Sequence, residues 1–314
     1  MDKKIYEKLT RQARIQIQKT PRKVMIKVKK IYDKAADDLA KIVESLPADS
    51  FSLQVQTSTA LISELNQASE NIATALSDTT LEYIDTNAVT ATSVDKSFMV
   101  GAGLDEQKVA DIIQSVNQEA VIATVSRVWQ NGYTFSQNVW KVGESYQDDI
   151  KSVLSSGIAQ GRDPFQIAKD IQVYTKDGKV KLMKSYGKLK KGVKGFSKRI
   201  PKSVDYRATR LVKTEIYTSL REVEAMSAET NPGTTGFYNW IRQQGAAHYD
   251  CECPDLAANG PYLYEDIPGT PHPNCACYVQ AILRDQREFT ADLAKWANGE
   301  DVDYLDDWAA KQNY

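Results

Sequence analysis

Cysteine and histidine are almost absent from this 314-residue chain, and the few that it has lie together. All four cysteines and both histidines fall within residues 248–278, so no other stretch offers a thiol or an imidazole to a soft metal. Long apolar runs are lacking too, and none reaches the roughly 20 residues that cross a bilayer. The first residues, MDKKIYEKLTRQ, hold no apolar stretch of the kind a signal peptide needs. We therefore expect no membrane anchor and a protein made in a cytoplasm, where thiols stay reduced.

An overall excess of charge is also missing, because 40 basic residues balance 41 acidic ones. The charges are nevertheless segregated: residues 1–34 carry a net +9 and residues 176–202 a net +10. Such blocks can neutralise phosphates without reading a base sequence, or they can simply keep exposed faces solvated. Both interpretations stay open. The candidate DNA- or anion-contacting residues are Lys181, Lys184, Lys188, Lys190, Lys191, Lys194, Lys198 and Arg199.

Apolar side chains recur at helical spacing along most of the chain. The pattern predicts helices over 2–19, 22–46, 57–92, 105–130, 144–160, 204–229 and 286–298, and the sequence GRDPFQIAKDI predicts another that is capped by Asp163 and opened by Pro164. Asp177 and Gly178 form a hairpin-type turn signal. The expected fold is mainly α, with an elongated helical N-terminal region and a small, loop-rich α+β C-terminal domain closed by a Cys/His metal clip.

The composition divides the chain into five consecutive segments. Residues 1–46 are expected to form basic N-terminal helices, and residues 47–175 a helical domain. Residues 176–202 read as a basic arm or hairpin. Residues 203–280 hold a helix with a Thr-Glu pair and the Cys/His region, and residues 281–314 an acidic helix and tail.

The Cys/His region offers five good donors for the four positions of a tetrahedral zinc site. These candidate ligands are Cys251, Cys253, His272, Cys275 and Cys277. His248 is the donor that we expect least. The stretch between the two cysteine pairs is rich in proline and glycine turns and poor in apolar mass, so one structural zinc per chain would replace the missing core.

Two other chemistries remain open for the same cluster. One cysteine of each pair could join in a disulfide if the protein met an oxidising environment. A catalytic zinc would instead keep an open position beside a carboxylate such as Asp250, Glu252 or Asp255.

The helix predicted over 204–229 carries Arg207, Arg210, Thr214 and Glu215. Arg210, Thr214, Tyr217 and Arg221 fall on one stripe of this helix, and with Glu215 they could form an anion-binding or catalytic patch. The alternative is a polar seam between helices, in which Arg207 or Arg210 pairs with a carboxylate and Thr214 bonds a backbone carbonyl. Because the chain has no glycine-rich phosphate loop, we favour the seam and expect no catalytic residue.

Three features in order resemble the phage head morphogenesis family, the minor head proteins of the Mu F-like kind. The first is the helix with Arg207, Ala208, Leu211, Thr214 and Glu215, and the second is Trp240 followed by Asp250, Cys251, Cys253 and Gly260. The third is the ending His272-Pro273-Asn274-Cys275-Ala276-Cys277. The chain departs from the family in having Cys-x-Cys for the usual Cys-x-x-Cys, and Ala276 for the usual arginine. The resemblance covers roughly residues 145–280.

The resemblance implies a minor structural protein of a tailed-phage head. Such a protein would be assembled in the host cytoplasm, form an oligomer in the virion and meet portal, capsid or scaffold proteins. It would assist head morphogenesis and DNA packaging or ejection, with non-specific contact to packaged DNA. A zinc-dependent nuclease or other enzyme acting on phage DNA, and a soluble DNA-binding module, are the alternatives.

Overall fold

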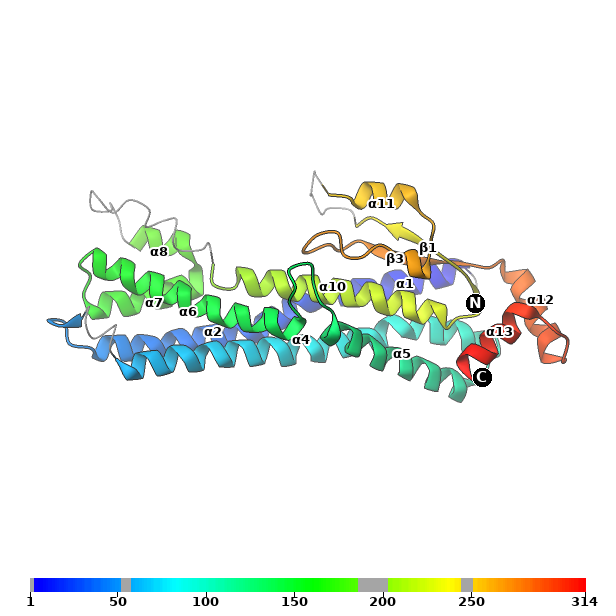
Figure 1. Cartoon of the computed structure of the whole chain (residues 1–314), viewed down its shortest axis with the longest axis horizontal. Coiled ribbons are helices and arrows are strands. Elements are labelled where there is room, and N and C mark those ends of the chain that lie inside the picture. Colours follow the sequence, from blue (N-terminus) through cyan, green and yellow to red (C-terminus); the bar gives the residue numbers. More distant parts are fainter. Residues whose placement is uncertain (1–2, 52–57, 186–202, 244–250) are drawn as a thin grey trace. The chain divides into compact units, whose positions relative to one another are not determined.

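The computed structural model describes residues 3–51, 58–185, 203–243 and 251–314, which are mainly helical and include one small sheet (Figure 1). This confirms the predicted mainly α fold with a small C-terminal α+β part. The helices are α1 (Lys3–Ile17), α2 (Thr20–Ser45), α4 (Thr59–Gly101), α5 (Glu106–Ser126), α6 (Phe135–Ala159), α7 (Pro164–Asp177), α8 (Lys179–Ser185), α10 (Tyr206–Glu229), α11 (Cys253–Asn259), α12 (Gln286–Ala297) and α13 (Asp303–Gln312). None of the helices in these ranges combines the length and the apolar character that crossing a membrane requires.

The chain folds into two compact units that do not follow chain order. The first unit comprises residues 1–21, 80–127 and 213–314, and the second comprises residues 22–79 and 128–212. The boundaries fall within α2, α4 and α10 and after Arg127. Each unit is therefore assembled from stretches far apart in the sequence.

Most predicted helices are present, with shifted ends. Pro21 lies in the first turn of α2 rather than between two helices, because a first-turn residue needs no backbone N–H donor. Helix α4 continues nine residues beyond the predicted end at 92, and α6 begins nine residues before the predicted start at 144. Thr134 fixes the start of α6 through a capping box with Gln137.

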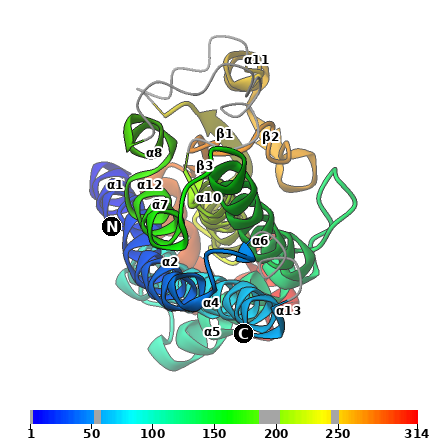
Figure 2. The same ribbon diagram turned by 90° about the vertical axis from the view of Figure 1, so that its left-hand side faces the viewer.

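The second unit has a core between α2, α4, α6 and α7. The apolar stripe of α2 is buried there at Val24, Val28 and Leu39, together with Tyr146 of α6 and Tyr174 of α7. Helix α7 begins as the sequence predicts, with Asp163 as N-cap and Pro164 in the first turn. Figure 2 shows α2, α6 and α7 end on.

Residues 176, 177 and 179–185 are helical, so this stretch does not form the predicted hairpin. Gly178 ends α7 with φ +78°, and its N–H donates to the carbonyl of Tyr174. Helix α8 follows at once. The Asp-Gly signal was misread because a glycine at positive φ serves a helix C-terminus as well as a hairpin turn. Residues 186–202, the rest of the predicted basic arm, lie outside the described residues.

The first unit contains an antiparallel sheet in the order β2-β1-β3, formed by β1 (Thr234–Ile241), β2 (Tyr262–Leu263) and β3 (Tyr278–Leu283). Tyr238 and Trp240 of β1 are buried on one face, as period-two alternation requires. A second cluster in this unit buries Phe98, Phe289 and Trp308. The acidic C-terminal segment therefore packs on the helices of the unit through its apolar side chains.

Candidate metal centre

Two short segments of the first unit bring the cysteines together. Cys251 and Cys253 stand at the start of α11, with Cys253 as its first residue. Cys275 and Cys277 precede β3, and their alternation places both on the buried face that Val279 continues. The strands of the sheet therefore set the spacing between the two segments.

The donor atoms form two overlapping groups. The first holds Cys251, Cys253 and His272, and the second holds Cys253, Cys275 and Cys277, with all donor atoms of a group within 4.8 Å of one another. The Sγ atom of Cys253 lies 3.4 Å from Nε2 of His272 and 3.6 Å from Sγ of Cys275. In tetrahedral zinc coordination the S···N and S···S edges are about 3.6 and 3.8 Å, as follows from ordinary bond lengths. Both measured distances are close to these values.

The orientation of His272 also suits a ligand. Its Nδ1 atom lies 3.0 Å from the carbonyl oxygen of Pro273, so an Nδ1–H tautomer donates there and leaves the lone pair of Nε2 directed to Cys253. Asn274 follows with φ +61°, a conformation that asparagine adopts more readily than most residues. This turn carries the chain from His272 to Cys275.

The pKa values of the buried thiols are strongly shifted. Burial raises the pKa of Cys253 to about 12. The hydrogen bond from Cys275 lowers the pKa of Cys277 to about 5 and raises that of Cys275 itself. The neighbouring thiols thus share a single favoured thiolate, because several negative sulfurs cannot be buried together without a cation.

The donor set fits a metal ion. Cys253, Cys275 and Cys277 are buried, and they belong to a small apolar cluster with Tyr238 and Trp240. Thiolates and an imidazole at these separations are the ligands that zinc and other soft ions prefer. The two groups could therefore hold a metal ion.

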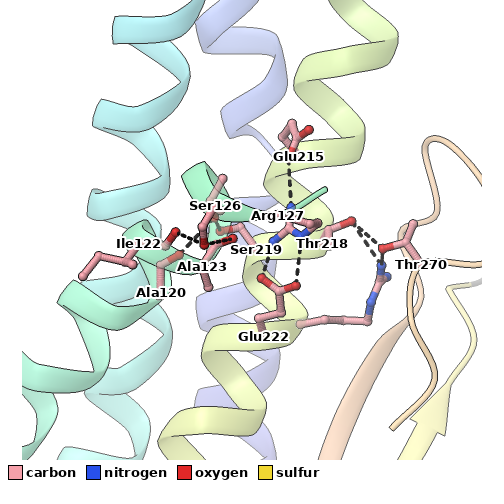
Figure 3. A network of polar contacts seen from close by, with 12 residues as sticks. Ala120, Ile122, Ala123, Ser126, Arg127, Glu215, Thr218, Ser219, Glu222 and Thr270 are labelled. Carbon is pink, nitrogen blue, oxygen red and sulfur yellow. Dashed lines mark hydrogen bonds and ion pairs between the residues drawn. The ribbon is translucent and has the colours of Figure 1, made fainter. Parts of the chain in front are cut away.

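One face of α10 binds the loop of residues 270–277, which carries His272, Cys275 and Cys277 and is called the metal loop below. Thr214 Oγ1 accepts a hydrogen bond from the backbone N–H of Asn274 at 2.9 Å. Thr218 and Thr270 share a hydrogen bond of 2.6 Å, as Figure 3 shows. Arg221 is the next residue on this face, since positions three and four apart are neighbours on a helix.

Arg221 is 4 % exposed and makes the largest number of these contacts. Its guanidinium donates to the carbonyl oxygens of Cys277 at 2.6 Å and Cys275 at 3.3 Å, and to Thr270 Oγ1 at 2.6 Å. It also lies over the ring of Trp240, 5.3 Å from its centroid. Burial lowers the pKa of Arg221. This side chain fixes the backbone between the last two cysteines.

Two of the predicted polar residues of α10, Arg207 and Glu215, form ion pairs. Arg207 pairs with Asp149 at 3.3 Å in the second unit. Glu215, fully buried, pairs with Arg127 at 2.9 Å in the first unit, and Arg127 also binds Glu222 (Figure 3). Arg210 is exposed. Arg207 thus pairs with a carboxylate, whereas Thr214 accepts a hydrogen bond from the backbone N–H of Asn274 where the seam interpretation expected a bond to a backbone carbonyl.

The structure describes only two of the predicted anion-contacting residues. Lys181 and Lys184 are exposed on α8, and Lys181 pairs with Asp177 at 3.3 Å. Lys188, Lys190, Lys191, Lys194, Lys198 and Arg199 lie outside the described residues, as do His248 and Asp250. Sequence reasoning did not single out Thr218 and Thr270, and it placed Arg221 on the polar stripe of the helix without predicting its contacts to the cysteine backbone. The spacing of Thr214 and Arg221 on one helical stripe was the available signal.

Comparison of the chain with models of known protein families, with curated proteins and with solved structures found no match. The resemblance to the minor head proteins is thus an expectation from the sequence motifs alone.

Proposed function

We propose that the chain is a minor, non-enzymatic structural protein of a tailed-phage head, with one structural zinc ion per chain. In this proposal it associates with the portal protein and with capsid or scaffold proteins, forms an oligomer in the particle, and assists head morphogenesis and DNA packaging or ejection. Its basic blocks contact packaged DNA without reading the sequence.

The contact between the resembling motifs carries this proposal. The Thr-Glu helix, the tryptophan and the His-Pro-Asn-Cys-x-Cys ending are separate in the sequence. In the first unit Thr214 binds Asn274, and Arg221 binds the backbone of Cys275 and Cys277 while it covers Trp240. Motifs that form a single packed site support a shared structural origin better than motifs scattered over the surface.

Burial favours a structural over a catalytic role for the metal. Three of the four thiols lie inside an apolar cluster, whereas a catalytic zinc keeps one position open to substrate and water. Glu215, a candidate general base for an enzyme, is fully buried and ion-paired with Arg127. A base in that state is not available to accept a proton from a substrate.

The proposed ligands are Cys253, His272, Cys275 and Cys277. Cys253 belongs to both groups of donors, and its two measured contacts, with His272 and Cys275, match tetrahedral edges. Cys251 is only partly buried, and we assign it no bond to the metal.

Elemental analysis of the purified protein tests the metal. We expect one zinc per chain in the wild type and in Cys251→Ser, and a loss of zinc in Cys275→Ser. If Cys251→Ser lost zinc and His272→Gln retained it, the fourth ligand would be Cys251 in place of His272. A wild-type protein purified without chelator that contains no metal would remove the zinc proposal.

Quantitative mass spectrometry of purified particles tests the structural role. Counting copies of the chain relative to the portal, before and after DNA release, should find a small fixed number in the head. Absence from both precursor and mature particles would contradict the proposal. Retention or loss with the DNA would separate an assembly role from a role in ejection.

A further inference from the structure

The second unit contains a polar cavity of about 140 Å³ that the metal centre does not use. It lies where the C-terminus of α7 meets α2 and the residues before α10. Single waters need only about 10–15 Å³ in the same measure, so the cavity can hold a larger polar group. The lining residues are Lys29, Tyr32, Thr175, Lys176, Asp177, Gly178, Ser203, Val204 and Asp205.

This cavity is lined by a residue with a buried hydroxyl that lacks a hydrogen-bond partner among the described residues. Tyr32 is 1 % exposed, and among the described residues its hydroxyl has no hydrogen-bond partner. Its ring packs edge-on against Tyr146, with 5.6 Å between centroids, so the phenol cannot swing out to solvent without breaking the core. Buried hydroxyls are nearly always paired, and an orphan in a polar cavity indicates a group that the protein binds there.

The Tyr32 hydroxyl is a donor at physiological pH. Burial, and after it the carboxylate of Asp205, raises the pKa of Tyr32. The phenol therefore keeps its proton and can donate it to an acceptor such as an anionic oxygen.

Two of the four charged lining residues already have ion-pair partners. Lys176 pairs with Asp37 at 3.1 Å, and Asp177 pairs with Lys181 at 3.3 Å. Among the described residues Lys29 donates one hydrogen bond, a 3.5 Å contact to the carbonyl oxygen of Lys176, although an ammonium has three donors. Within that part of the chain, the charged groups of the cavity without an ion pair are the ammonium of Lys29 and the carboxylate of Asp205.

The wider surroundings favour an anion. On α2 the residues Lys23, Lys27, Lys29, Lys30 and Lys34 are exposed, and α8 adds Lys181 and Lys184. Clustered cations of this kind raise the local concentration of anions. A simple anion would still be repelled by Asp205, unless it carried a proton that it could donate to that carboxylate.

We propose that the cavity binds a protonated phosphate group, either inorganic hydrogen phosphate or a phosphate monoester, with Lys29 and Tyr32 as donors to its oxygens and Asp205 as acceptor of its P–OH. Sulfate has no such proton at neutral pH, and neither has the phosphodiester of a nucleic-acid backbone. The site therefore discriminates between oxyanions of the same shape, and it is separate from any sequence-blind contact of the basic blocks with DNA.

Calorimetric titration with inorganic phosphate at pH 7, and with sulfate at matched ionic strength, tests this site in the full chain. The wild type should bind phosphate in a saturable manner and sulfate at least about tenfold more weakly. Tyr32→Phe, which removes only the hydroxyl, should weaken phosphate binding about tenfold. The exposed Tyr206→Phe is the matched control and should bind as the wild type does.

Asp205→Asn supplies a second, independent readout. The amide no longer repels sulfate, so this variant should bind both anions with affinities within about threefold of each other. Three outcomes would overturn the proposal: no saturable phosphate binding by the wild type, equal binding of sulfate and phosphate by the wild type, or unchanged phosphate affinity in Tyr32→Phe.

Discussion

At the scale of single residues, Arg221 connects the metal loop to α10. It is buried, and it donates to two backbone carbonyls and one hydroxyl of the loop. Replacement by methionine keeps the aliphatic bulk but leaves these acceptors unpaired. We expect Arg221→Met to lower the free energy of unfolding by about 2–4 kcal/mol. Because such supporting contacts orient metal ligands, the metal affinity of the proposed site should fall about 10–100-fold.

Urea unfolding and competition with a chelator measure these two effects of Arg221→Met. The exposed Arg287→Gln on α12 is the control, and it should change neither quantity. If both variants behaved alike, the contacts of Arg221 would have no role in holding the site.

Asp95 of α4 is another buried charge, and it makes stability depend on pH. Its carboxylate accepts hydrogen bonds of 2.8 Å from Tyr6, Ser227 and Asn231, none of them cationic. Burial raises its pKa from the usual 3.8. The contribution of Asp95 to the free energy of unfolding is therefore greatest below pH 3.8, where the carboxyl group is protonated in the folded and in the unfolded chain. This contribution is lost as pH rises through the raised folded-state pKa.

We expect Asp95→Asn to remove this loss. Between about pH 4 and the raised pKa, the wild type should lose up to about 1.4 kcal/mol of unfolding free energy per pH unit from this group. The variant should show a correspondingly flatter profile of urea midpoint against pH. The exposed Asp111→Asn serves as control. Parallel profiles for wild type and Asp95→Asn would show that Asp95 titrates normally.

At the scale of elements, Gly143 allows α6 to approach α4 closely in the second unit. A Cβ at this position would stand 2.5 Å from the backbone oxygen of Ser69 and 2.9 Å from its Oγ. Alanine normally favours a helix over glycine by up to about 1 kcal/mol. Here the clash with backbone should dominate, and Gly143→Ala should lower the free energy of unfolding by about 1–3 kcal/mol.

Gly101 provides the matched comparison for Gly143→Ala. It ends α4, and a Cβ there would meet nothing within 4 Å. Gly101→Ala should thus be neutral or slightly stabilising in thermal or urea unfolding. If both substitutions changed the free energy of unfolding in the same direction, helix propensity rather than close packing would decide the effect of Gly143→Ala.

The local signals of this sequence predict its helices better than its strands. Asp163 and Pro164 mark the start of α7 because capping depends on neighbouring residues alone. The strands β1 and β3 were not located individually, because they are stabilised by pairing across more than 35 residues, for example between Tyr238 and Ala281. The same limit applies to Arg221, whose partners are distant in sequence. The metal donors were identified because cysteine and histidine occur nowhere else in the chain.

At the scale of the whole molecule, the division into two units could not be read from the composition. Charge blocks suggested consecutive segments, whereas each unit combines separated stretches of chain. Long helices such as α4 contribute residues to both units, so three of the four boundaries fall inside a helix, where no turn or linker marks them. The periodicity of an amphipathic helix shows that one face is buried, but it does not say which partners bury it.

Removal of the metal should affect the two units unequally. Cys253, Cys275 and Cys277 belong to the small cluster that includes residues of β1 and β3, so loss of a metal bound there would remove a cross-link between the two segments that carry them. The core of α6 and α7 contains Tyr146, Ile150 and Ile167, and its described residues form no group of three or more metal donors. We therefore expect hydrogen exchange in β1 and β3 to accelerate at least about tenfold on chelation, with little change in α6 and α7.

Cys275→Ser without chelator should reproduce this pattern, which separates metal loss from a direct effect of the reagent. Equal acceleration in both units would mean that they unfold as one cooperative body, and no acceleration in the sheet would mean that the apolar cluster holds the segments without a metal.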